Sequence, residues 1–214
     1  MPDLVLDLLE NGGGADFAVG PILPYIYTNP VKNIGVDVFS TAANIAGWKK
    51  ILADEDIPAD NKKNISRMIS MMENNKGRLV NIVNDETDSS YQPLPFPRKV
   101  IILINKGCAS TTEQFLLYAR QSTKVILAGE DTQGTLDYSN MREASFECFP
   151  YLLNYATTRS RRLDVHKGID NIGIKPKYYF KEDTDWIAAA MKLAQQEFKY
   201  NKKPESCYAS RLLL

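Results

Sequence analysis

Residues 99–130 constrain the fold of this chain more than any other stretch. Residues 99–105 form an apolar run, residues 110–121 have the apolar spacing of a helix, and residues 124–130 form a second apolar run. A strand, a helix and a strand at this spacing imply two parallel strands joined by a crossover helix. The sequence therefore predicts an α/β protein with a parallel sheet.

The segments that precede this unit supply further elements. Residues 3–9 predict a buried strand that ends at the glycine-rich sequence ENGGG. Residues 15–29 are apolar enough for a helix, but Pro21 and Pro24 interrupt it, so we expect a short, broken helix. Weak alternation of apolar and polar residues over 32–40 predicts one strand.

A helical excursion is predicted over residues 41–76, because apolar residues recur there at spacings of three and four. Pro58 divides the excursion into two helices, and Gly77 suits its end. The excursion could cap a cleft, form a dimer face or pack against its own domain. Residues 84–97 are polar and proline-rich and predict a loop.

The C-terminal third predicts two strands and one helix. Residues 144–159 have the composition of two strands. Residues 185–198 have the pattern of an amphipathic helix, for which Asp183 or Thr184 is the expected cap.

Composition argues against several classes of protein. The 26 Lys and Arg residues balance 26 Asp and Glu residues, so no nucleic-acid or acidic-membrane partner is expected, and the basic residues 157–163 suit a solvated strand end or loop. No apolar run reaches the roughly 18 residues of a membrane span. Cys108, Cys148 and Cys207 lie far apart and His166 is the one histidine, so no disulfide framework, metal site or cofactor is expected.

Ser110 lies where the apolar run ends and the helix begins, and two interpretations fit it. Ser110 and Glu113 have the S-x-x-E spacing of a capping box. Alternatively, the hydroxyl lies at the end of a parallel sheet, where ligand sites gather. The backbone N–H of Thr111 would then point outward and, aided by the helix dipole, could stabilise an oxyanion.

The sequence Gly12-Gly13-Gly14 offers a second backbone donor at the exit of the first strand. Without side chains in the way, an amide in this segment could face a ligand. A plain turn is the alternative interpretation.

Four motifs, LVLDLLENGGG, VIILINKGCASTTEQF, GEDTQG and IDNIGIKP, occur in this order and span residues 3 to about 180. Together they resemble the serine peptidases of the C-terminal processing (tail-specific) and tricorn-core type. The stretches PILPYIYTNPV, LDYSN and TTRSRRL resemble a tricorn-like branch often met in Bacteroidetes. The resemblance implies an α/β, crotonase-like core of repeated β-β-α units over residues 1–202, with residues 41–76 as a helical insertion and residues 203–214 as a loose tail.

The resemblance also implies roles for individual residues. Ser110 would be the nucleophile, and the backbone amides of Thr111 and of Gly12 or Gly13 would form the oxyanion hole. Glu113 would remain structural, as the capping partner of Ser110.

The chain departs from the family pattern at several positions. Leu9 replaces the usual Arg and Lys177 the usual Asp, which we interpret as local changes of packing or charge. One branch has a catalytic Lys just after G-E-x-T-x-G, but Thr135 occupies that position, 25 residues after Ser110, so a Ser–Lys dyad there is excluded. The other branch uses a His oriented by a carboxylate, and Asp170 occupies the position of that carboxylate, usually a Glu.

The general base is the largest departure. In the His-dependent branch the base lies before the first glycine motif, whereas the single histidine here, His166, lies four residues before Asp170 in an expected loop. His166 is the alternative base. We expect instead that the chain is the C-terminal part of a longer peptidase; a degenerate homologue would have the same sequence features.

The sequence therefore predicts a serine endopeptidase domain that acts on peptide or protein substrates. A catalytically inactive peptide-binding domain of the same fold is the alternative, and an acyl-CoA enzyme with a similar oxyanion hole is a weaker one. The resemblance implies a periplasmic or cell-envelope location for the full-length relative, although the N-terminal residues of this chain have no signal-peptide pattern.

Overall fold

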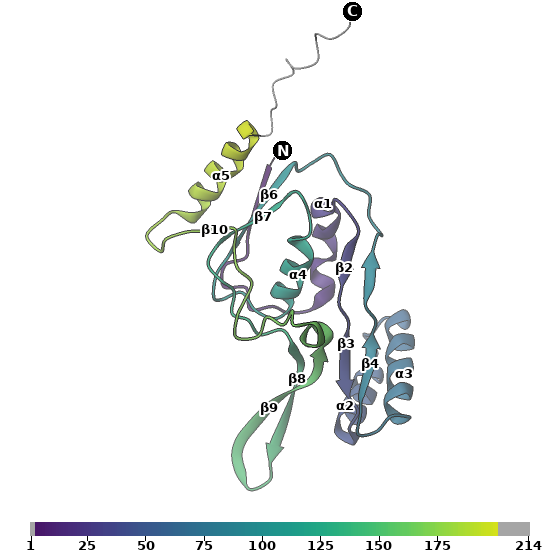
Figure 1. The fold of residues 1–214 in the computed structure, drawn as a ribbon. Coiled ribbons are helices and arrows are strands. Elements are labelled where there is room, and N and C mark those ends of the chain that lie inside the picture. Colours follow the sequence, from purple (N-terminus) through teal and green to yellow (C-terminus); the bar gives the residue numbers. More distant parts are fainter. Residues whose placement is uncertain (1–2, 201–214) are drawn as a thin grey trace, which may run out of the picture.

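A four-stranded parallel sheet forms the centre of the computed structural model, which describes residues 3–200 (Figure 1). Its strand order is β1 (Asp3–Asp7), β6 (Lys99–Ile104), β7 (Val125–Gly129) and β10 (Tyr178–Tyr179), and every neighbouring pair is parallel. Helix α4 (Thr111–Ala119) connects β6 to β7. The predicted parallel pair with a crossover helix is confirmed.

Helices cover both faces of this sheet because β6 is apolar on both sides. Val100, Ile102 and Ile104 pack in one core cluster with side chains of α4. Ile101 and Leu103 point to the other face, where they pack in a cluster with residues of helix α5 (Trp186–Tyr200). A short 3-10 helix, η1 (Asp16–Ile22), and helix α1 (Leu23–Ile26) form the predicted broken helix.

A second, antiparallel sheet has the order β4 (Leu79–Val83), β3 (Val36–Phe39), β9 (Phe149–Ser160) and β8 (Tyr138–Phe146). A separate two-stranded sheet pairs β2 (Val31–Asn33) with β5 (Glu86–Asp88). The chain therefore has a mixed α/β fold with parallel and antiparallel sheets.

The single strand predicted over residues 32–40 is wrong, because β2 and β3 belong to different sheets. Gly35 lies between them, and a Cβ atom there would lie 1.8 Å from the carbonyl oxygen of Val83. The chain changes sheets at a close backbone contact that only glycine permits.

The predicted helical excursion is confirmed as α2 (Ala42–Leu52) and α3 (Ala59–Glu73). The two helices pack on β3 and β4 through a separate apolar cluster, which includes Ile45, Met72 and Val80. Figure 1 shows this pair beside β3 and β4, away from the parallel sheet. The excursion therefore packs against the antiparallel sheet of its own chain.

Two boundaries near the C-terminus differ from expectation. The predicted strand pair over residues 144–159 is a longer hairpin that begins at Tyr138. Its first six residues are mostly polar, and the two apolar ones, Tyr138 and Met141, are exposed and do not alternate regularly with the polar ones. The cap of α5 is neither Asp183 nor Thr184: the backbone N–H of Ala188 donates to Asp185 Oδ1 (3.0 Å). The predicted tail, residues 203–214, lies outside the described residues, and the extent of the domain over 1–202 stays a prediction.

Within residues 3–200, no helix has the length and apolar character needed to cross a membrane.

Replacing Ile102 by Ala tests the packing of the central strand. Ile102 is fully buried in β6, so the truncation should lower the free energy of unfolding by about 2–5 kcal/mol. Ile187→Ala is the matched control, because Ile187 is 44% exposed and should change stability by less than about 0.5 kcal/mol. Urea unfolding followed by circular dichroism measures both variants, and equal losses would contradict the assignment of β6 to the core.

Candidate active site

Ser110 occupies a strained turn between β6 and α4. Its backbone has φ 54° and ψ −123°, a region that side-chain-bearing residues rarely adopt. Such a conformation costs on the order of 1–3 kcal/mol. A strained strand-to-helix turn is also the geometry in which known hydrolases expose a nucleophilic serine.

The capping-box interpretation of Ser110 is wrong. Ser110 is the residue before α4, but its side chain makes no capping hydrogen bond. The carboxylate of Glu113 is fully buried and accepts hydrogen bonds from Thr132 Oγ1, from the backbone N–H of Gly134 (2.8 Å) and from that of Thr135 (2.8 Å). Glu113 is structural as expected, but it anchors the loop after β7 and is not the partner of Ser110.

The glycine segment lies directly against Ser110. Because β1 and β6 are adjacent parallel strands, the segments that leave their carboxyl ends meet at one edge of the sheet. A Cβ atom on Gly13 would lie 2.8 Å from Ser110 Cβ and 2.9 Å from the backbone N of Thr111. The structure thus brings together the two strand exits that the sequence places about one hundred residues apart.

The backbone amides of Gly12 and Thr111 are among those at this junction that donate to no partner among the described residues; those of Gly14 and Ser110 are others. The amide of Gly13 is occupied, because it donates to Asn11 Oδ1 (3.1 Å). An anionic or carbonyl oxygen could therefore find free N–H donors here without breaking a hydrogen bond.

Asn11 is a positioning residue that our sequence analysis did not identify. Its Oδ1 accepts from Thr112 Oγ1 (2.7 Å) as well as from Gly13, and its carbonyl oxygen accepts from the backbone N–H of Ala109 (3.1 Å). Thr111 Oγ1 adds a bond to the carbonyl oxygen of Gly14 (2.7 Å). The sequence signal for this role was an asparagine, which is typical of turns, directly before three glycines.

Asp170 lies on a neighbouring turn and is bound to backbone amides. Its Oδ1 accepts from Leu136 and Asp137 (2.7 Å each), whereas its Oδ2 accepts only a longer bond from Tyr138 (3.3 Å). Oδ2 therefore keeps acceptor capacity for a further donor. No hydrogen bond joins Asp170 to Ser110; the connection runs through the loop that Glu113 binds.

His166 is exposed at the end of the 3-10 helix η2 (Arg161–Val165), with a left-handed backbone (φ 55°, ψ 36°). In the described part of the chain, no hydrogen bond joins the side chain of His166 to the Ser110 hydroxyl.

Neither the thiol of Cys108, which lies near Ser110, nor a metal offers an alternative centre in the described part of the chain. Cys108 is buried, and desolvation raises the pKa of its thiol, which donates to the carbonyl oxygen of Leu8 (3.0 Å). A thiol with a raised pKa is a poor nucleophile. Residues 3–200 contain no group of three His, Cys, Asp or Glu residues that could hold a metal ion.

A small cavity of about 280 Å³ lies beside the glycine segment and Thr111. Its walls are mostly apolar, with side chains from β1, η1 and α4 that include Leu6, Val19, Ile22 and Phe115. A cavity of this kind next to Ser110 can accept an apolar side chain.

The sequence pattern of "Peptidase family S41" matches residues 1–180. The fold is similar to that of a peptidase candidate from Parabacteroides merdae (TM-score 0.55, 16% identity, 92% of this chain and 51% of that chain covered). It is also similar to mature CPAF (TM-score 0.62, 13% identity, 95% and 45% covered).

The chain thus spans about half the length of these two solved structures. At such low identities the likeness concerns the fold alone. No curated protein matches the chain.

Replacing Gly13 by Ala tests the junction. Gly13 has φ 103°, which disfavours an L residue by about 1–2 kcal/mol, and the added methyl group would collide with Ser110 and Thr111. We expect a loss of stability of at least about 1 kcal/mol, and a displaced Ser110.

Gly12→Ala is the matched control. A Cβ atom on Gly12 would meet nothing within 4 Å, so this variant should keep wild-type stability. Thermal unfolding of both variants measures the difference, and equal melting temperatures would contradict the close approach at Gly13.

Proposed function

Because the chain belongs to peptidase family S41, a family of serine peptidases, we propose that it cleaves peptide bonds with Ser110 as the nucleophile. The observation that carries the proposal is the strained turn of Ser110 beside free backbone amides, which include those of Gly12 and Thr111. Acyl transfer requires a nucleophilic oxygen and N–H donors for the oxyanion at the same carbonyl group.

In the proposed reaction, Ser110 Oγ attacks the carbonyl carbon of the scissile bond. The backbone N–H groups of Thr111 and Gly12 stabilise the oxygen that becomes negative, and Gly13 could join them only by leaving Asn11. Removal of one such donor lowers turnover by roughly 10²–10³-fold in other serine peptidases. The amine then leaves with a proton, and water releases the acyl group from Ser110.

The proton acceptor in this proposal is a histidine outside these 214 residues. His166 is exposed and has no hydrogen bond to Ser110. The free acceptor capacity of Asp170 Oδ2 suits the N–H of an incoming imidazole, which it would hold in the productive tautomer. Glu at this position in relatives is longer by one methylene, so the histidine would have to approach Asp170 more closely.

The substrate in this proposal is a peptide or protein with an apolar side chain next to the scissile bond. The cavity of about 280 Å³ beside Thr111 would hold that side chain. A cell-envelope location of the full-length protein remains part of the proposal, on the resemblance alone.

Fluorophosphonate labelling of the chain tests the nucleophile and the base together. We expect slow labelling at Ser110, because the lack of a general base costs about 10²–10⁴-fold. Added imidazole should accelerate it at least tenfold, since the half-buried Ser110 is open to a small base. Mass spectrometry locates the label, and Ser110→Ala is the control.

Other outcomes discriminate between the alternatives. Rapid labelling that needs no imidazole and is lost in His166→Ala would identify His166 as the base. If imidazole produced no labelling at all, the inactive peptide-binding domain would be the better interpretation.

A further inference from the structure

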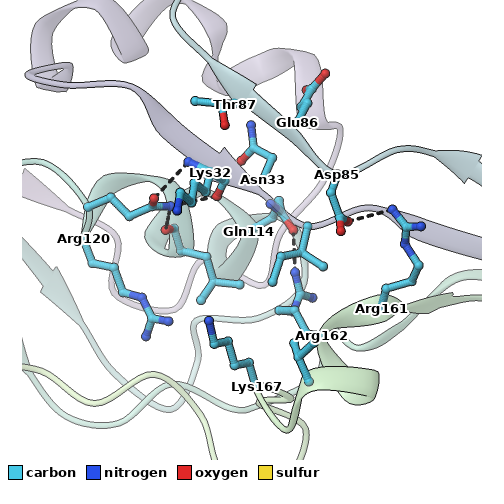
Figure 2. Close-up of a pocket in the computed structure, with 14 residues that line it drawn as sticks. Lys32, Asn33, Asp85, Glu86, Thr87, Gln114, Arg120, Arg161, Arg162 and Lys167 are labelled. Carbon is cyan, nitrogen blue, oxygen red and sulfur yellow. Dashed lines mark hydrogen bonds and ion pairs between the residues drawn. The ribbon is translucent and has the colours of Figure 1, made fainter.

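A second cavity, larger than the one beside Thr111, lies between the β2–β5 sheet, helix α4 and η2 (Figure 2). It has a volume of about 550 Å³. Its walls contain five cationic side chains, Lys32, Arg120, Arg161, Arg162 and Lys167. The proposed peptidase chemistry uses none of them.

The positive charges of this basic cavity are only partly neutralised. Arg161 pairs with Asp85 (2.7 Å), and the buried Arg162 pairs with Asp137 (2.9 Å). Among the described residues, Lys32, Arg120 and Lys167 form no ion pair. Three unpaired cations thus face a single unpaired carboxylate, that of Glu86.

Glu86 does not neutralise these cations. Figure 2 shows its carboxylate at the opposite rim of the cavity, pointing away from Arg120 and Lys167. The side chains of Arg120 and Lys167 extend into the cavity from α4 and from the turn after η2. The excess of positive charge therefore lies on one side of the cavity.

Arg120 and Arg162 also repel each other. Desolvation lowers the pKa of the Arg120 guanidinium, and the charge of Arg162 lowers it further. Arg162 cannot move away, because Asp137 and Gln114 Oε1 (3.2 Å) hold its guanidinium. An anion between the two groups would relieve the repulsion.

The basic cavity begins one helical turn from Ser110. Gln114 lines it, and the backbone N–H of Gln114 donates to the carbonyl oxygen of Ser110 (3.0 Å). Leu117 of α4 continues the wall, followed by Arg120 and Gln121 just beyond the end of the helix. At 1.5 Å per helical residue these side chains lie about 6–16 Å from Ser110 along the helix axis, which an extended peptide covers in about two to five residues.

We propose that this cavity binds acidic side chains of the polypeptide substrate, about two to five residues from the bond that Ser110 attacks. This inference rests on the proposed peptidase function, because the acidic side chains in the cavity belong to the same polypeptide that Ser110 would cleave. Carboxylates suit the site, since guanidinium groups bind them with paired hydrogen bonds. A cavity of this size has room for more than one side chain.

Peptide binding tests the proposal without requiring cleavage. The probes are two fluorescent peptides of equal length, one with three Glu residues and one with Gln in their place, added to the Ser110→Ala chain. Fluorescence anisotropy should show the Glu peptide binding at least tenfold more tightly at low salt. The difference should shrink as salt screens the charges.

The double variant Arg120→Gln/Lys167→Gln should abolish the preference for the Glu peptide. Lys50→Gln/Lys63→Gln is the charge-matched control, because both lysines are exposed on α2 and α3, and it should keep the preference. Unchanged melting temperatures establish that both double variants fold.

Equal affinities for the two peptides, or a preference that survives in the Arg120/Lys167 variant, would overturn the proposal. A third outcome would also overturn it: neither peptide binds, but inorganic phosphate stabilises the chain, and this stabilisation is lost in the Arg120/Lys167 variant. The cavity would then be a site for small anions. A failed Ser110 labelling experiment together with the expected peptide preference would reject the peptidase and retain the acidic-peptide site.

Discussion

The buried carboxylate of Glu113 is the interaction on which the arrangement around Ser110 depends. A carboxylate without solvent must receive hydrogen bonds, and all three of its donors come from the loop after β7. Thr132 extends the connection, because its Oγ1 also accepts from the backbone N–H of Ile174 (2.7 Å). The first turn of α4, the loop after β7 and the turn before β10 are thereby held together.

Two further carboxylates continue this pattern toward the basic cavity. Asp137 Oδ2 accepts from the backbone N–H groups of Ile169 and Asp170, and Asp170 Oδ1 accepts from those of Leu136 and Asp137. Each aspartate thus fixes the turn that carries the other. Asp137 also holds the buried Arg162 at the wall of the cavity, and removing one member of such a pair leaves an uncompensated charge. The turn of Ser110 and the basic cavity therefore belong to one hydrogen-bonded framework.

The sequence predicts the parts of this structure that local patterns determine. The apolar runs of β1, β6 and β7 and the spacing in α2 and α3 are local signals, and the structure confirms these elements. The separation of β2 from β3, in contrast, depends on the close contact of Gly35 with the backbone of Val83, which lies nearly fifty residues away in the sequence. The hydrogen-bond donors to Glu113 likewise lie about twenty residues further along the chain. The S-x-x-E spacing is a local signal and therefore predicts a helix cap that does not form. The backbone conformation of Ser110 has no sequence signal.

The backbone of Ser110 and the closeness of Arg120 to Arg162 share one property: neither stabilises the folded chain. A helix cap adopts an extended backbone and accepts a hydrogen bond, whereas Ser110 has φ 54° and makes no such bond. Glycine would adopt this backbone at lower cost, so the hydroxyl group brings no stability to the turn. The repulsion between Arg120 and Arg162 likewise opposes folding. Strain and unpaired charge of this kind are typical of functional sites. A ligand that presents a carbonyl group to Ser110 and a carboxylate to Arg120 accounts for both features, and an acidic polypeptide presents both groups.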